Sequence, residues 1–249
     1  MKKEYITEAI WGKLLIFFKS IKGINVGDEK KLKNFITAIY WMIRTGAQWR
    51  ELPTDYGKWN SIFKRFNAWA HKGIWVAFHK YFIEDPDLEY IMIDATVVRA
   101  HACAAGYGKQ ELEGLGRSVG GFTCKIHAKI DALGNPLEFI ITPGNRHDIT
   151  QAGKLLQNVT DSHVIGDRGY DSNVFRNTLI SQNCTPVIPS KSNSLNPCEY
   201  DKHIYKERHI IECFFGKIKY FRRIFSRFDK SARNYLACLS FVGVFIWLR

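Results

Sequence analysis

Residues Tyr90–Ala100, YIMIDATVVRA, are the stretch of this 249-residue chain with the strongest strand character. Apolar and β-branched residues follow one another almost without interruption, as expected of a central strand that is buried on both faces. Asp94 lies in the middle of the run, where a carboxylate costs free energy unless it is paired or binds a metal. An ordinary buried, hydrogen-bonded aspartate is the alternative. The stretch predicts a sheet whose central strand carries a candidate functional acid.

The residues that follow predict a hairpin. Residues 104–121 form a Gly-rich loop, residues 122–130 alternate strictly, and the turn 131–135 (DALGN) leads into a strand over 136–142. The alternation places on one face of residues 122–130, which suits a wet or phosphate-facing surface, the side chains of Thr123, Lys125, His127 and Lys129. A histidine packed in the core is nevertheless the commoner outcome for His127. We list neither it nor His101 or His147 as a ligand.

Helices and short strands alternate in the next part of the chain. Asp148 or Thr150 is placed to cap a helix that runs to about Leu156. A short strand over 163–166 ends in GDRGYDS, so Asp167 lies at its tip, and another strand is predicted over 185–189 after an intervening helix. Together these elements predict an α/β, ribonuclease-H-like domain, with a five-stranded mixed sheet flanked by helices.

Residues 205–223, YKERHIIECFFGKIKYFRR, predict one amphipathic helix. At about 100° per residue, a polar arc of roughly 60° holds Tyr205, Arg208, Glu212 and Lys219. Glu212 is the single acid among the cations Arg208, Lys219 and Arg223. A solvated helix face is the plain interpretation. The functional interpretation is that Glu212 binds a metal while the cations hold phosphates.

Three carboxylates are predicted to meet at one edge of the sheet. Asp94 lies on the first strand, Asp167 at the end of the neighbouring fourth strand, and Glu212 on the late helix that crosses this edge. Such carboxylates repel one another unless a divalent cation neutralises them. All-oxygen ligands suit Mg²⁺ or Mn²⁺, and two such ions about 3.5–4 Å apart support phosphoryl transfer. Asp167 in its Gly-flanked turn has a simpler alternative, which is to shape that turn.

The N-terminal residues predict a small all-α domain. Helices are expected over 30–45, ended by Gly46, and over 59–71 and 74–82. Polar side chains lie outward on the second of these helices, among them Asn60, Lys64 and Asn67. This pattern suits a helix-turn-helix-like DNA-binding module, and an ordinary three-helix bundle is the alternative. The polar residues 84–89 divide the chain into a helical domain, 1–86, and a catalytic domain, 87–249, whose apolar residues 235–248 predict a buried C-terminal helix.

Composition indicates the kind of partner. The chain has 36 Lys and Arg against 24 Asp and Glu, a net charge of +12, which favours a polyanion such as nucleic acid. Its six cysteines show no CxxC pattern, so reduced cytoplasmic thiols are expected rather than a zinc site. No apolar run reaches the roughly 20 residues of a membrane span, and no signal-peptide core is present. We therefore expect a soluble protein without a membrane partner.

Several motifs carry a family resemblance. They are DAT…H at 94–101, the block GGFTCKIHAKIDALGNPLEFIITPGNRHD at 120–148, GDRGYDS at 166–172, and Tyr205-x2-Arg208-x3-Glu212-x6-Lys219. With residues 44–69 and 227–241, these motifs resemble the DDE transposases of bacterial insertion sequences, and more narrowly insertion sequence family five. The resemblance covers nearly the whole chain. The chain departs from the family pattern at Arg168 and Cys213, neither of which belongs to the three acids.

The resemblance implies roles for individual residues. Asp94, Asp167 and Glu212 would be the catalytic, metal-binding triad, with Mg²⁺ or Mn²⁺, two ions, as the cofactor. Tyr205, Arg208 and Lys219 would contact the DNA ends, and the N-terminal helices would recognise the terminal inverted repeats. Together with the charge pattern, this gives as candidate DNA-binding residues Tyr205, Arg208, Lys219, Arg223, Asn60, Lys64 and Asn67.

The expected function is that of a DNA transposase. It would bind the double-stranded terminal inverted repeats of its element, cleave their 3′ ends and join them to target DNA, as a homodimer or larger assembly at the bacterial nucleoid in the cytoplasm. One alternative is a non-catalytic DNA-binding protein derived from a transposase, against which the intact triad argues. Another is a ribonuclease-H-like nuclease without strand transfer, which would not need the basic N-terminal module.

Overall fold

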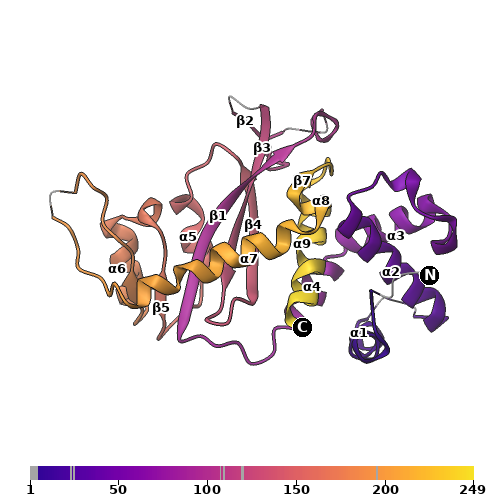
Figure 1. Cartoon of the computed structure of the whole chain (residues 1–249), viewed down its shortest axis with the longest axis horizontal. Coiled ribbons are helices and arrows are strands. Elements are labelled where there is room, and N and C mark those ends of the chain that lie inside the picture. Colours follow the sequence, from indigo (N-terminus) through magenta and orange to yellow (C-terminus); the bar gives the residue numbers. More distant parts are fainter. Residues whose placement is uncertain are drawn as a thin grey trace.

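The computed structural model describes residues 5–22, 24, 26–106, 108, 110–118, 121–194 and 196–249. Residues 1–4 of the expected N-terminal domain and Gly120 of the quoted block lie outside them. The described residues form a mixed α/β structure, with a sheet at one end and the N-terminal helices at the other (Figure 1).

The N-terminal part is helical, as expected. Its helices are α1 (Glu8–Ser20), α2 (Glu29–Thr45), α3 (Trp59–His71) and α4 (Ile74–Tyr81), with short 3-10 turns at Trp49–Glu51 and Thr54–Tyr56. The Asp28 carboxylate accepts the first free N–H groups of α2, those of Lys30 and Lys31. Gly46 ends α2 in the left-handed conformation at φ 68°, so the predicted stop is confirmed.

The sheet contains seven strands within the described residues, two more than expected. They are β1 (Tyr90–Ala100), β2 (Gly116–Ser118), β3 (Gly121–Ile130), β4 (Pro136–Pro143), β5 (His163–Ile165), β6 (Thr185–Val187) and β7 (Ser226–Arg227). The main path is β2-β3-β1-β5-β6, with β4 paired to β3 and β7 to β1. The two additional strands, β2 and β7, are only 3 and 2 residues long, too short for a hydrophobic period to reveal.

The expected central position of β1 is confirmed. It pairs antiparallel with β3 and parallel with β5, in a register that sets Asp94 opposite Ala128 and Met92 beside Ile165. The hairpin of β3 and β4 and the alternation of helix and strand that follows are also as expected. Helix α5 (Ile149–Leu155) lies between β4 and β5 in the chain, and α6 (Asn173–Ser181) lies between β5 and β6.

The predicted single helix over 205–223 is wrong, because the chain breaks it twice. Its first residues form a 3-10 turn, η5 (Ile204–Arg208), followed by α7 (His209–Lys219) and a short separate helix, α8 (Arg222–Phe225). Phe221 is extended at φ −85° and ψ 104°, which ends the first helical path before α8 begins. Helix α7 crosses β1 (Figure 1).

The C-terminal helix α9 (Ala232–Trp247) is almost entirely buried, as the sequence predicted. It packs against α3, α4 and β4, and its Phe241 ring lies 5.6 Å from that of Trp75. Gly243 is necessary there, because a Cβ atom at this position would lie 2.6 Å from His79 Nε2. One hydrophobic cluster consequently runs from the N-terminal helices through α9 to the sheet.

Two expectations from composition can be compared with the structure. The six cysteines, all within the described residues, are free thiols. None of the helices in the described ranges has the length and apolar character needed to span a membrane.

Candidate active site

Asp94, in the middle of β1, has interactions that affect its ionisation in opposite directions. Its Oδ1 accepts the N–H of Ala95 at 2.7 Å, and its Oδ2 accepts from Arg208 NH1 at 3.2 Å. Burial raises the pKa of Asp94 to about 6, with the charges of Asp167 and Asp148 adding to the increase and the Ala95 N–H and Arg208 opposing it. A nearby cation therefore favours the ionised form of the Asp94 carboxyl group.

Asp167 follows β5 directly and begins the 3-10 turn η4 (Arg168–Tyr170). Its Oδ1 accepts the N–H of Gly169 at 2.8 Å, so the residue does shape its turn. The parallel register of β1 and β5 also brings it beside Asp94, because each residue lies two positions beyond the paired Met92 and Ile165. Both roles weighed from the sequence are therefore compatible.

Glu212 reaches this site through Arg208. It lies on the exposed side of α7 and forms an i,i+4 ion pair with Arg208, whose guanidinium also contacts Asp94. One cation therefore bridges two of the three predicted acids. Among the described residues, no group of three His, Cys, Asp or Glu side chains is arranged to hold a metal ion.

The acids nevertheless fit a divalent cation in two respects. Their donors are all carboxylate oxygens, the ligands that Mg²⁺ and Mn²⁺ prefer. A positive group, the Arg208 guanidinium, already lies between Asp94 and Glu212, where a cation would be stabilised.

The other predicted DNA contacts on this segment lie near the acids. Lys219 Nζ donates to Thr96 Oγ1 at 2.7 Å, so α7 follows β1 past Asp94. Tyr205 is half-buried in η5, with its ring 5.4 Å from that of Tyr200. Burial raises the pKa of Tyr205, and the Asp167 charge adds to the increase while Arg208 opposes it. Arg208 and Lys219 thus both reach β1 from the polar side of this segment.

Arg223 requires a correction. Instead of facing solvent with the other cations, it is buried and forms a two-bond ion pair with Asp229, at 3.0 Å in both contacts. It also donates to the carbonyl of Ala47 at 3.0 Å and lies over the Trp49 ring. The break before α8 turns its side chain inward, so its guanidinium is already used within the protein.

The three candidates on α3 lie far along the chain from the acids. Asn60 and Lys64 are exposed. Asn67 is half-buried and lines a cavity of about 320 Å³ together with Trp49, Phe63 and Arg233. The outward orientation expected from the helix period therefore holds for the first two of these residues.

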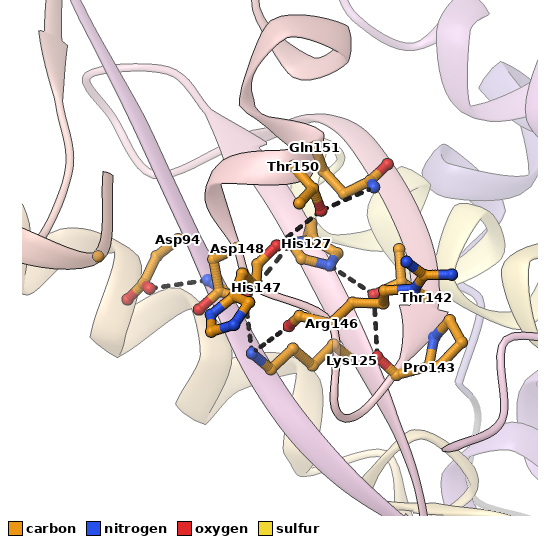
Figure 2. A network of polar contacts seen from close by, with 12 residues as sticks. Asp94, Lys125, His127, Thr142, Pro143, Arg146, His147, Asp148, Thr150 and Gln151 are labelled. Carbon is orange, nitrogen blue, oxygen red and sulfur yellow. Dashed lines mark hydrogen bonds and ion pairs between the residues drawn. The ribbon is translucent and has the colours of Figure 1, made fainter. Parts of the chain in front are cut away.

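A polar network that the sequence did not predict lies against β1 (Figure 2). Asp148 was a candidate helix cap, but its side chain makes no capping bond and instead accepts from Lys125 Nζ at 2.8 Å. The face of β3 expected to be wet is covered, because Thr123, His127 and Lys129 are buried. His127 on this face is thus a core residue. The motif PGNRHD at 143–148 was the sequence signal for Asp148. Its pairing with Lys125 could not be predicted, because the two residues are distant in sequence.

Tyr170 is the second residue that the sequence did not single out. It is the last residue of η4, its side chain is fully buried, and its hydroxyl has no hydrogen-bond partner among the described residues. Burial raises the pKa of Tyr170 well above its usual value, and the charges of Asp94, Asp148 and Asp167 add to the increase. The hydroxyl therefore remains protonated at neutral pH.

The chain matches two known protein families. The family described as "Transposase DDE domain" matches residues 85–242, and "Putative transposase of IS4/5 family" matches residues 6–79. The chain is 38% identical over 130 residues to a Brucella ovis protein, "Putative transposase for insertion sequence element IS6501", covering 51% of this chain and 99% of that protein. It is 30% identical over 120 residues to the corresponding IS402 protein of Burkholderia cepacia, covering 43% and 54%.

Solved structures of transposases are more distant. The piggyBac transposase in a synaptic complex with hairpin DNA has a TM-score of 0.44 and 10% identity, covering 74% of this chain and 47% of that chain. The Mos1 transposase in a paired-end complex with the left transposon end has a TM-score of 0.29 and 11% identity, covering 88% and 90%. The matched part of the chain thus spans about half the length of the IS402 relative and of the piggyBac chain.

The family match covers well over half of the chain and includes all three predicted acids. Residues 85–242 hold Asp94 on β1, Asp167 after β5 and Glu212 on α7. The separate match to residues 6–79 covers the N-terminal helices. The chain belongs to the DDE transposase family.

Proposed function

We propose that this protein binds the terminal inverted repeats of its insertion sequence, cleaves their 3′ ends in a metal-dependent reaction and transfers them into target DNA. The observation that carries the proposal is the shared contact of Arg208 with Asp94 and Glu212, beside Asp167. It brings the acids predicted for catalysis and a cation predicted for DNA contact into one site.

The fold assignment that accompanies this function is also a proposal. The order of β1, β3, β4 and β5, with helices between the later strands, supports a ribonuclease-H-like catalytic domain over 87–249. Residues 1–86 would be the helix-turn-helix-like DNA-binding domain. The exposed Asn60 and Lys64 on α3 support its contact with the repeats.

The acids and the cations have separate tasks in this proposal. Asp94, Asp167 and Glu212 would hold Mg²⁺ or Mn²⁺, which when bound activates the attacking oxygen and stabilises the leaving oxygen. Arg208, Lys219 and Tyr205 bind the DNA backbone beside the acids. A phosphate that pairs with Arg208 competes with Asp94 and Glu212 for the guanidinium, so DNA binding strengthens cation binding by the acids without being required for it. Cleavage and joining use the same site because only the attacking oxygen differs.

The negative charge of DNA complements the positive charge of the protein. The net charge of +12 and the cations at η5 and α7 favour contacts with phosphates, so binding should weaken strongly as salt increases. Joining two element ends in one event favours a homodimer or a larger assembly on the DNA.

The test is cleavage of labelled DNA that carries the element's own repeats. Wild-type protein with Mg²⁺ or Mn²⁺ should nick the repeat end and join it to a supercoiled target. Asp94→Ala and Glu212→Gln should reduce nicking to the level of the metal-free reaction while retaining binding to the repeat, because DNA contact uses the neighbouring cations.

Glu138→Gln is the matched control, since Glu138 is an acid of the same sheet that pairs with Lys129 at 3.1 Å. This variant should nick as the wild type does. A Glu212→Gln protein that still nicked DNA would contradict the assignment of the acids. Binding by the wild type without nicking would favour the non-catalytic alternative, and nicking without joining would favour the nuclease.

A further inference from the structure

Asp148 is fixed against the sheet by a lysine clamp. Lys125 Nζ donates to Asp148 Oδ1 and to the carbonyl of Arg146, at 2.8 Å in each case (Figure 2). Both side chains of the ion pair are largely buried, with 15% of Lys125 and 26% of Asp148 exposed. The second hydrogen bond of Lys125, to the Arg146 carbonyl, fixes the loop before α5 as well. The orientation of Asp148 is therefore set by the fold.

His127 is directed at the same carboxylate. Its side chain is fully buried, and Nε2 is bonded to Thr142 Oγ1 at 2.7 Å. The other ring nitrogen, Nδ1, has no hydrogen-bond partner among the described residues and lies 3.9 Å from Asp148 Oδ1. Burial lowers the pKa of His127 to about 4, so the ring is neutral at pH 7. An unpaired buried nitrogen of this kind is uncommon and points to a functional reason.

The strand register brings this network close to Asp94. His127 lies opposite Ala95 on β1, and α5 contacts both β3 and the turn η4 that Asp167 begins. In Figure 2, Asp148 lies on the side of the network that is nearer to Asp94. Asp148 is therefore directed toward the acid at the centre of β1, although it comes from a different layer of the fold.

The hydroxyl of Tyr170 completes the evidence for a polar centre. It is buried, lacks a partner among the described residues, and belongs to the turn η4, which follows Asp167 and contacts α5. An unpaired hydroxyl in an apolar core costs free energy. In this turn the hydroxyl is a donor available to a bound ligand or to the water that a ligand carries.

We propose that Asp148 is a fourth carboxylate of the acidic centre, positioned by Lys125 and His127, and that it strengthens the binding of a hard divalent cation by Asp94 and Asp167. The inference rests on the proposed function and deepens it. A further negative charge in a poorly solvated site increases the affinity for a cation, and a group that supports metal ligands without being one contributes about 10–100-fold. Asp148 is a positioning residue in this proposal.

The test measures Mn²⁺ binding directly, without relying on activity. Purified full-length protein is titrated with MnCl₂, and free Mn²⁺ is followed by electron paramagnetic resonance. Asp148→Asn keeps the size of the side chain and should increase the Kd for Mn²⁺ at least about tenfold. Asp148→Glu, which restores the charge, should recover most of the affinity.

Glu138→Gln is the control for charge loss, because it breaks the Lys129 ion pair on the same two strands and should leave the Kd unchanged. Near-ultraviolet circular dichroism verifies that each variant is folded. An Asp148→Asn protein that binds Mn²⁺ as the wild type does, while Asp94→Ala has lost binding, overturns the role of Asp148 alone. Wild-type protein that binds no Mn²⁺ overturns the metal site of the proposed function as well.

Discussion

Arg208 sets the charge balance of the acidic centre at the scale of single residues. It is the only cation among the described residues that forms ion pairs with both Asp94 and Glu212, and a planar guanidinium is suited to such a shared contact. Without it, Asp94 would carry its charge beside Asp167 and Asp148 with little compensation. The protein thus offsets part of the negative charge of the site with one of its own side chains.

His79 makes the stability of the protein sensitive to acid. It is buried between α4 and α9, its Nε2–H donates to the Pro136 carbonyl at 2.9 Å, and burial lowers its pKa to about 4. Between about pH 6.5 and pH 4 the unfolded chain binds a proton at this residue and the folded chain does not. The free energy of unfolding should therefore fall as the pH decreases through this range, by up to about 3 kcal/mol. Above pH 6.5, protonation of His79 should make no contribution to the pH dependence of stability.

The measurement is urea unfolding of wild type and His79→Gln at several pH values. The variant should lose this part of the decrease, so the difference between the two proteins should change between pH 6.5 and pH 4. His203→Gln serves as control because His203 is exposed. Parallel pH profiles for wild type and His79→Gln would show that His79 is protonated in the folded protein as readily as in the unfolded chain.

At the scale of elements, Arg223 attaches α8 both to Asp229, which follows β7, and to the loop that follows α2. Arg223 contacts Asp229, the Ala47 carbonyl and the Trp49 ring. Arg223→Ala would leave the Asp229 carboxylate buried without its partner. We expect the free energy of unfolding to fall by about 3–5 kcal/mol, measured by urea denaturation.

Arg222→Ala is the matched comparison. Arg222 is the adjacent residue of α8, but it is exposed, and alanine keeps the Cβ atom that packs near Gly46. Its stability should change by no more than about 0.5 kcal/mol. If Arg223→Ala were as stable as Arg222→Ala and instead bound DNA less tightly, Arg223 would be a DNA contact after all.

The elements differ in how well the sequence predicts them, for physical reasons. Helix α3 and strand β1 have long, regular patterns of apolar residues, and their predicted bounds coincide with the observed ones. Strands β2 and β7 are too short for a pattern, and pairing with β3 and β1 alone defines them. A helical period also continues across the break at Phe221, because an average over many residues does not register one extended residue.

The site is predictable to a similar degree. The sequence indicates the place of Asp94 within a central strand and that of Asp167 at the tip of another strand. The role of Asp148 depends on a tertiary contact with Lys125, and that of Arg223 on a turn that brings Asp229 back to it. The alternation of β3 predicts that Lys125 and His127 share a face, but it cannot show that α5 and its loop cover that face.

At the scale of the whole molecule, the hydrophobic core connects the two expected domains. A single cluster includes Trp75 of α4, Phe241 of α9 and Ile126 of β3. Helix α9 forms most of this connection, because it contacts the N-terminal helices and also β4. Residues from both ends of the described chain thus depend on one another for burial.

The shared core predicts that the N-terminal helices and the sheet unfold together. Six of the seven tryptophans precede residue 76, and the seventh is Trp247 of α9, so fluorescence reports on the helical end. Hydrogen exchange of β1 and β3 peptides reports on the sheet. We expect the two probes to give the same urea midpoint.

Two separate midpoints would contradict this prediction and would mean that the helices and the sheet are independent folding units. Leu236→Ala provides a useful comparison, because Leu236 on α9 is only partly buried against the same cluster. Its substitution should lower both midpoints equally if α9 couples the two parts.

The position of α9 in the chain has a consequence for protein synthesis. This helix follows every other described helix and strand, yet it covers the aromatic side chains of Trp75 and Phe78. While the ribosome is still translating the sheet, these side chains have no α9 to bury them. The growing chain therefore exposes an aggregation-prone aromatic surface, accessible to chaperones and to neighbouring nascent chains, until α9 has been translated.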